Sequence, residues 1–498
     1  MSPTENLLLP TPTHLSSAQL PPSGTLVSGR RHRILVGVSA MALVAAWLVS
    51  GPLLGLGFAG VLLLGVMLLA AFQTLVRRRP WRALLVRDAD SLGHSWVGKV
   101  VVAVVLVLIP AAMVLSSAVG HRYGRYADDS WKALLMLVVL AGTYLVSRRL
   151  LLTVFVASVT VGLASWVMSP NLATDRNGDA TVLAHLTQQA GWGNLTGYQD
   201  VAVAEIDLRA PQAVRLAGIG ADDTTVMEVG SMTKAMTGLV IADAVRRGEI
   251  RMDAPVATYL PQLKGSPAGT VTMHELVTHT SGYAEFGAAT LQRAAWKAPL
   301  GQNFFTADVT QMTEETRNQT LSGRGGFAYS TLGAATAGQA AAAAAQMSYP
   351  DLMRTRLFEP LGMSHTAIEA DHALVTGGRS QSGLPVQPWV MDAYAPGAAA
   401  VSTTGDLAKL ATALLDGTAP GMAALEPTTP TDLWNTRIGD FWHTTTWQTG
   451  QTITHHAGQT GGYASYLGLD RTGHKAVIVL SDVANDASDL GSQLLANR

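Results

Sequence analysis

The chain has 498 residues, of which 48% are hydrophobic and only 14% are charged, whereas an ordinary soluble domain is roughly 25% charged. Its formal net charge of −1 gives no reason to expect nucleic acid as a partner. The sequence contains no Cys, which excludes disulfide bonds and thiolate chemistry. The shortage of charge lies mainly in residues 34–168, so the composition predicts a membrane portion followed by a globular one.

Long apolar runs fill this first portion. Most of them approach the roughly 20 residues with which a helix crosses the hydrocarbon core of a bilayer. They are apolar all round and not along one face only, which argues against a buried soluble bundle. We therefore expect an all-α transmembrane bundle of about five helices within residues 30–169. The runs are 34–49, 53–76, 100–119, 133–146 and 150–168.

Arginines give the orientation of the predicted bundle. They cluster at 30–33, 77–87 and 148–149, and the positive-inside tendency places all three clusters in the cytoplasm. Five crossings then put everything after Ser169 outside a bacterial plasma membrane. A single helix over 133–168 is the alternative, but it would be about 54 Å long and would bury two arginines near the middle of the bilayer.

Three segments follow from this pattern. Residues 1–29 are rich in Ser, Thr and Pro, which predicts a disordered cytoplasmic tail. Residues 30–169 form the transmembrane region, whose partner is the lipid bilayer. Residues 170–498 form the extracytoplasmic domain.

The outer domain begins and ends with strand patterns. Residues 198–206 and 213–220 predict a hairpin, and helical period follows Gly230 as far as about Arg247. Strands at both ends with helices between them predict one α+β domain, whose sheet is completed by N- and C-terminal segments. We expect helical or helix-and-loop segments at 274–282, 332–347, 351–363 and 401–415, strands at 451–458, 463–470 and 474–482, and a closing helix.

The stretch EVGSMTK at 228–234 places a serine at a helix start and a lysine one turn later. Ser231 has two interpretations, because Ser is a preferred helix N-cap as well as a nucleophile. As a nucleophile it would lose its proton to Lys234, provided that burial lowers the pKa of that amine toward neutrality. The free N–H groups of the helix start also suit a developing oxyanion.

A zinc signature is rejected in the same region. His274 and Glu275 are followed by His279, which resembles H-E-x-x-H with the second His one position too late. On a helix these two rings are about 140° apart, so they do not converge on one metal. We expect neither a metal nor another cofactor.

The outer domain resembles the serine β-lactamase and penicillin-binding protein superfamily, most closely its class C β-lactamase and esterase branch. Five segments carry the resemblance in order, and together they run from about residue 180 to the end of the chain. They are VMEVGSMTKAMTG around Ser231, LVTHTSGY at 276–283, LFEPLGM at 357–363, VSTTGDLAKLATALL at 401–415 and HAGQTGGY at 456–463. The resemblance implies a mixed helical and antiparallel-sheet fold.

The resemblance also implies roles for the residues of the nucleophile segment and of YSTLG. Ser231 would be the nucleophile, and Lys234 and Tyr329 would carry its proton to the leaving group. Where the family usually has Tyr-x-Asn, this chain has Thr331 as the third residue, which puts its grip on a β-lactam or peptide amide in doubt. A buried structural tyrosine remains the alternative for Tyr329.

The late strand would form the other wall of the site. His456 stands where penicillin-binding enzymes have the Lys of K-T-G, although a plain strand histidine beside His455 is the alternative. The backbone N–H of Gln459 would join that of Ser231 in an oxyanion hole. Gly458 and its neighbours would let a substrate approach the strand closely.

Three functions compete on this sequence. The first is a membrane-anchored serine hydrolase that forms an acyl-enzyme with a cell-wall D-amino-acid peptide, a β-lactam or a small ester or amide. The second is a penicillin-binding-like sensor that acylates slowly or not at all, which the departure at Thr331 favours. The third is a transporter or lipid-binding unit, but the apolar runs hold no acidic or basic residue for an ion pathway.

Overall fold

The computed structural model describes residues 170–496, except for 192–194, 196, 369–374, 376 and 382. The predicted tail and the five apolar runs lie outside the described residues, so the transmembrane bundle stays a prediction. Within the described part of the chain, no helix is both long and apolar enough to span a bilayer.

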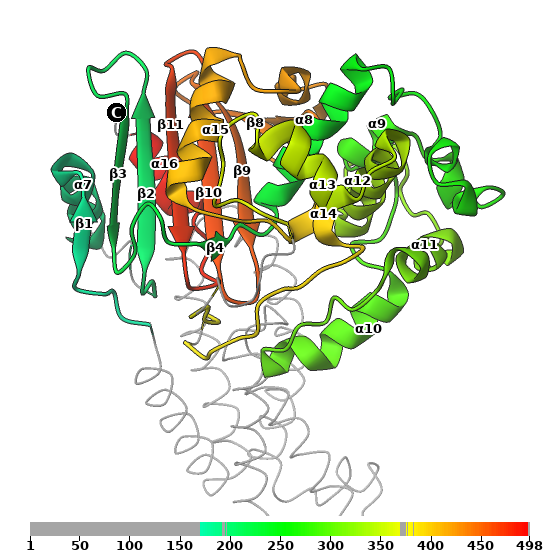
Figure 1. The fold of residues 1–498 in the computed structure, drawn as a ribbon, viewed down its shortest axis with the longest axis horizontal. Helices are drawn as coiled ribbons and strands as arrows, with labels where there is room; N and C mark the ends of the chain where they lie inside the picture. The colour runs from blue at the N-terminus through cyan, green and yellow to red at the C-terminus, as the bar shows by residue number, and fades with distance from the viewer. Residues whose placement is uncertain are drawn as a thin grey trace, which may run out of the picture.

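One antiparallel sheet forms the left half of the molecule in Figure 1. Its strand order is β1-β3-β2-β11-β10-β9-β8-β7-β6, so the N-terminal hairpin of β2 and β3 joins the C-terminal strands through the pairing of β2 with β11. The expected hairpin and the expected C-terminal strands are thereby confirmed. The strands are β1 (Arg176–Gly178), β2 (Val201–Asp207), β3 (Val214–Ile219), β6 (Thr429–Pro430), β7 (Thr436–Ile438), β8 (His443–Thr446), β9 (Thr452–Gln459), β10 (Ala464–Asp470) and β11 (Lys475–Ser481), with β4 (Met227–Glu228) and β5 (Val401–Ser402) in a separate pair.

Helices cover both faces of the sheet. The side chains of Val201 and Val203 lie in one apolar cluster with α7 and α16, and those of Ala202 and Ala204 lie in the main core with α8 and α15. This alternation follows from the period of two along a strand, and burial on both faces explains the nearly continuous apolar sequence. The α-helices are α7 (Ala180–Gly191), α8 (Met232–Arg246), α9 (Met273–Val277), α10 (Ala288–Lys297), α11 (Val309–Asn318), α12 (Thr331–Ala345), α13 (Tyr349–Met353), α14 (Ala395–Ala398), α15 (Thr404–Asp416) and α16 (Ser488–Ala496).

Short turns of 3₁₀ or π-helix connect these elements. The helical and loop-rich segment expected at 351–363 contains the short helix α13 followed by a π-helical turn, η6 (Arg354–Phe358). In the segment expected at 274–282 the helix ends at Val277, and the residues that resemble the family's T-H-T-S-G turn follow it. The 3₁₀ turns are η2 (Val256–Thr258), η3 (Pro261–Leu263), η4 (Ala268–Thr270), η5 (Ala298–Leu300) and η8 (Met422–Leu425).

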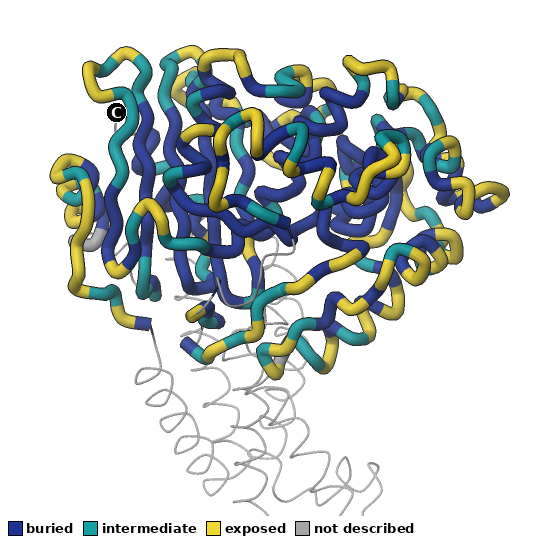
Figure 2. Tube along the Cα trace, viewed as in Figure 1, coloured by how far each residue is buried: buried dark blue, intermediate teal, exposed yellow. Residues whose placement is uncertain are grey.

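Helices α8 and α12 are the buried centre of the right half, dark along most of their length in Figure 2. Neither has a polar stripe, because each is surrounded by other helices and not by water on one side. Small residues allow the close packing: a Cβ on Gly338 would lie 2.2 Å from Cβ of Pro396 in α14. The start of α8 therefore lies deep in the domain, at the junction between helices and sheet.

Candidate active site

Backbone contacts bring Ser231 against strand β9. Gly230 has φ of +52°, and a Cβ there would lie 2.7 Å from the backbone nitrogen of Gln459. A Cβ on Gly458 would lie 2.0 Å from the carbonyl oxygen of Val229. Only glycine tolerates such an approach at both positions. The segment that carries Ser231 therefore packs directly against β9, as the resemblance implies.

The hydroxyl of Ser231 is not used to cap the helix. Ser231 occupies the N-cap position of α8, but its side chain makes no capping hydrogen bond. Its Oγ accepts a hydrogen bond of 3.0 Å from Nζ of Lys234. Since an N-cap serine would bond a backbone N–H of the first turn, the geometry fits the nucleophile interpretation better than the capping one.

Lys234 is fully buried, at 0% exposure. Its amine also donates to the carbonyl oxygen of Gly397, at 2.8 Å, and forms no ion pair with any carboxylate in the described part of the chain. Burial lowers its pKa from 10.5 to about 7, although the Glu285 carboxylate acts in the opposite direction. A large fraction of the amine is then unprotonated near neutral pH, as a general base requires.

Tyr329 completes this group. Its ring centroid is 4.8 Å from Nζ of Lys234, and the side chain of Ser231 is its hydrogen-bonding partner. Burial raises the pKa of its phenol above 10, so the hydroxyl keeps its proton at neutral pH. The structure thus brings together all three residues that the sequence indicates for catalysis.

His279 supports Tyr329, and the sequence analysis missed this role. Its ring packs on the Tyr329 ring at 4.5 Å between centroids, and its Nδ1 accepts from the backbone N–H of Ser330 at 3.2 Å. His279 lies beyond the end of α9, with φ of +56°, so the helical spacing that we used against zinc does not apply to it. Among the residues described, no group of three or more His, Cys, Asp or Glu is arranged to hold a metal ion.

Thr331 is the first residue of α12 and lies buried beside the amine. Its methyl group packs against Gly397, where a Cβ would come within 2.7 Å of it. Lys234 donates to the carbonyl of Gly397 and to Ser231, and not to the Thr331 hydroxyl. The residue that departs from the family pattern is therefore present in the site, but it does not hold the lysine.

His456 lies on the face of β9 that packs toward α8, the same face as Gly458. It belongs to a group of imidazoles, with ring centroids 5.5 Å from His443, which in turn lies 5.9 Å from His455. Burial lowers the pKa of His456 well below 6.5, and the neighbouring His443 and Lys234 act in the same direction. The ring is neutral at physiological pH, so it offers no fixed positive charge to a substrate.

The exposed side chain of Gln459 fixes the end of β9. Its Nε2 donates to the carbonyl oxygen of Ala484 at 2.6 Å, after β11. This bond holds the backbone next to Gly230 and Ser231, where the resemblance implies the oxyanion hole. An oxyanion hole requires backbone N–H donors and no particular side chain.

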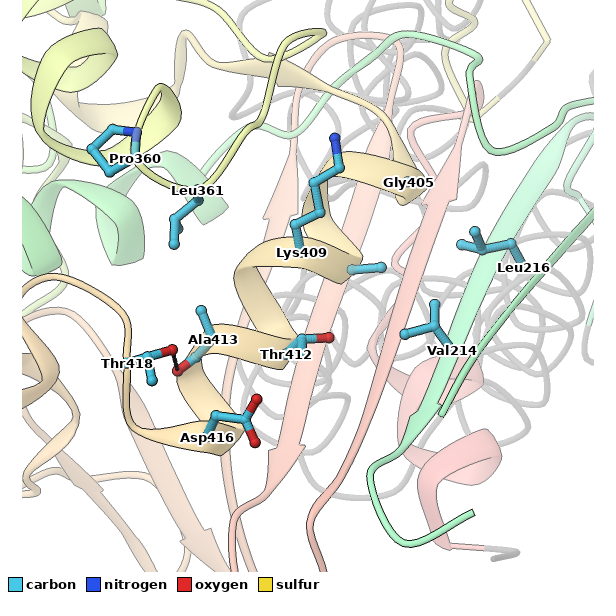
Figure 3. A pocket seen from close by; sticks show the side chains of 11 residues that line it. Val214, Leu216, Pro360, Leu361, Gly405, Lys409, Thr412, Ala413, Asp416 and Thr418 are labelled. Carbon is cyan, nitrogen blue, oxygen red and sulfur yellow. Dashed lines mark hydrogen bonds between the residues drawn. The ribbon is translucent and has the colours of Figure 1, made fainter. Parts of the chain in front are cut away.

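A separate groove of about 410 Å³ lies between α15 and β3. Figure 3 shows Lys409, Thr412 and Asp416 on one side of it and Val214 and Leu216 on the other. None of the residues around Ser231 lines this groove. It belongs to a different surface from the candidate active site.

Comparison with known proteins agrees with this geometry. The family model described as Beta-lactamase matches residues 153–496, more than half of the chain. The chain belongs to the β-lactamase family. The expected α+β fold is also that of a class C β-lactamase from Rhodobacter sphaeroides, with a TM-score of 0.51 and 21% identity over 61% of this chain and 94% of that one.

The names of the curated relatives point to different activities. A β-lactamase of Escherichia coli is 27% identical over 190 residues, 37% of this chain and 46% of the relative, so less than half of that protein's length is matched. Penicillin-binding protein 4 of Amycolatopsis lactamdurans is 27% identical over 277 residues, 50% of this chain and 70% of the relative. Esterase EstB of Burkholderia gladioli is 39% identical over 74 residues, 14% of this chain and 19% of the relative. The family therefore indicates a serine hydrolase without selecting one substrate.

Proposed function

We propose that this protein is a membrane-anchored serine hydrolase whose catalytic domain works outside the cytoplasm through an acyl-enzyme. The observation that carries the proposal is the buried amine of Lys234, 3.0 Å from the Ser231 hydroxyl and with a pKa of about 7. A lysine that served only packing or charge would have no reason to be buried without a carboxylate partner.

The reaction follows from these positions. The neutral amine of Lys234 takes the proton of Ser231, and Oγ attacks the carbonyl carbon of the substrate. The backbone N–H groups of Ser231 and Gln459 stabilise the oxyanion. Tyr329, which keeps its proton at neutral pH, passes a proton to the leaving group and is reprotonated through Lys234. Water then hydrolyses the acyl-enzyme.

Among the acyl substrates open to such a site, we favour a small ester over a β-lactam or a D-amino-acid peptide. Thr331 offers one hydroxyl where the family's Asn offers an amide for the substrate's acylamino carbonyl. His456 is neutral, so it gives no cation for a substrate carboxylate. An ester needs neither of these contacts for acylation.

A slowly acylating sensor is the second candidate, and the same Thr331 favours it. The two candidates separate when membranes that contain the full chain are labelled with a fluorophosphonate and with a fluorescent penicillin. We expect rapid fluorophosphonate labelling and weak penicillin labelling, both lost in Ser231→Ala, together with turnover of a chromogenic ester. Labelling without turnover would favour the sensor, and labelling that survives in Ser231→Ala would contradict both candidates.

A further inference from the structure

Helix α10 and the turn η5 that follows it expose large apolar side chains. Leu291, Trp296 and Leu300 are 57%, 56% and 53% exposed. The other exposed residues described within 288–300 are Ala288, Ala289, Gln292 and Ala295, so only one of them is polar. Leu291 and Trp296 are five positions apart, so they lie about 140° apart around α10, at the two edges of an exposed face that also carries Ala288, Gln292 and Ala295. An exposed face with so few polar residues marks a contact with a partner or a membrane. We call Leu291, Trp296 and Leu300 the α10 patch.

The charged side chains of the segment that carries the α10 patch are basic, and one of them, Arg293, lies 3.7 Å from the carboxylate of Glu315 in α11. Residues 286–307 contain no Asp or Glu, and their only ionisable side chains are Arg293 and Lys297. Nζ of Lys297 lies 5.7 Å from the centroid of the Trp296 ring. A Trp beside a Lys, with Leu as neighbours, is typical of helices that lie in the interface of a lipid bilayer, where cations also meet anionic headgroups.

Contacts place the α10 patch beyond one end of the sheet. After η5, the carbonyl oxygen of Gly301 accepts from the N–H of Gln387 at 2.7 Å. The neighbouring Val386 packs on the turn between β9 and β10, where a Cβ on Gly462 would lie 2.5 Å from it. The patch therefore lies at the end of the sheet where Gln459 pairs with Ala464.

The described part of the chain begins at this same end. One row of paired residues crosses the sheet from β1 to β9, so the segment that leads into β1 and the turn after β9 share an end. Figure 1 shows that segment and α10 both at the lower end of the molecule. The row consists of Arg176, Ile219, Val201, Ser481, Ala464 and Gln459.

We propose that the α10 patch docks on the outer surface of the bilayer that the chain itself spans. This inference rests on the membrane anchoring in the proposed function, because the last apolar run ends at 168, two residues before the described domain. Such a short tether holds this end of the domain at the bilayer, so a small apolar surface is enough for docking. Ser231 lies beside Gln459 at the same end, and docking brings the catalytic site close to the membrane surface.

Because the sequence contains no Cys, one introduced Cys gives a single labelling site. The experiment uses the full chain in vesicles of phosphatidylcholine and phosphatidylglycerol. We would attach an environment-sensitive fluorophore to Trp296→Cys and quench it with nitroxide-labelled lipids. Trp434→Cys is the matched control, because Trp434 is 53% exposed and precedes β7 at the opposite end of the sheet. Leu63→Cys, within the run 53–76, reports on anchoring itself.

We expect loss of fluorescence at 296 and 63 but not at 434. Adding Leu291→Ser and Leu300→Ser should return the signal at 296 toward that at 434. A label at 63 that lipid does not quench would contradict membrane anchoring, and with it the proposed function. Quenching at 63 with a signal at 296 like that at 434 would overturn docking alone. A label at 296 that is shielded from aqueous iodide but not quenched by lipid would assign the patch to a protein partner and also overturn docking.

Discussion

At the scale of single residues, the site is defined by what Lys234 lacks. Its amine has a hydroxyl and a carbonyl oxygen as hydrogen-bond partners but forms no ion pair with a carboxylate, and burial outweighs the attraction of Glu285 for its charged form. A salt-bridged lysine in the same place would keep its proton and could not act as a base. The pattern S-x-x-K alone does not show this difference. It depends on burial by α12 and α14, which come from distant parts of the sequence.

Ser231→Ala should abolish covalent labelling and turnover while leaving the fold nearly unchanged. The hydroxyl makes no capping bond in the structure, so its loss should lower the free energy of unfolding by less than the roughly 1 kcal/mol of a typical N-cap. Thermal unfolding of the purified variant checks stability, and ester hydrolysis checks activity. A variant that still hydrolyses the ester would remove Ser231 from the mechanism.

His279→Phe should slow acylation without weakening substrate binding. Phenylalanine keeps a ring against Tyr329 but removes the Nδ1 that accepts from the N–H of Ser330. An unsatisfied buried N–H costs about 1–3 kcal/mol, and the strain falls on the residue next to Tyr329. We expect kcat to fall by about tenfold or more with KM within a few-fold of wild type. A change confined to KM would mean that His279 shapes the binding surface and does not position Tyr329.

At the scale of elements, the sequence predicts those whose own pattern is strong. The hairpin of β2 and β3, the strands β9 to β11 and the helices α8, α12 and α15 have clear periods or motifs. The strands β6, β7 and β8 are two to four residues long and rich in Thr, and successive pairing decides their structure: β8 on β9, β7 on β8 and β6 on β7. The left-handed backbone of His279 could not be predicted either, because it gives no signal in composition.

Candidate site residues follow the same division. Those within motifs, Ser231, Lys234 and Tyr329, could be named from the sequence. Gly397 could not, because only its carbonyl oxygen is used and any residue supplies one. Glu228 was also missed: it lies three residues before Ser231, is buried, and accepts from the N–H of Trp389 at 2.5 Å.

Glu228→Gln should change stability in a pH-dependent way. Burial raises the pKa of this carboxyl from 4.5 to about 6, although hydrogen bonds from Thr460 and Trp389 act in the opposite direction. Because the folded-state pKa is the higher one, wild type loses stability as pH rises from about 4.5 to 6, by roughly 2 kcal/mol. Glu228→Gln lacks this loss. The unfolding temperature of Glu228→Gln, relative to that of wild type, should therefore be higher at pH 7.5 than at pH 4.5. If the unfolding temperatures of variant and wild type differ by the same amount at both pH values, the raised pKa of Glu228 is contradicted.

At the scale of the whole molecule, a membrane region that the sequence predicts precedes a β-lactamase-family domain that the structure describes. Three Arg clusters and an odd number of apolar runs predict that the domain lies outside the cytoplasm. A reporter that is active only outside the cytoplasm, fused after Arg498, should therefore be active. Activity of a cytoplasmic reporter at the same position would mean that the number of spans is even, as a single helix over 133–168 would make it.

The central claim is that Lys234 is the base that activates Ser231, and the acylation rate measured against pH tests it most directly. We expect the wild-type rate to rise with pH through about 7, as the amine loses its proton. Lys234→Arg keeps the charge and approximate length, but its guanidinium stays protonated at every working pH. Its acylation rate should fall at least about 100-fold, the lower end for general-base catalysis, with non-covalent substrate binding retained. A wild-type rate that is flat from about pH 5 to 9, with an Arg variant within a few-fold of it, would contradict the account.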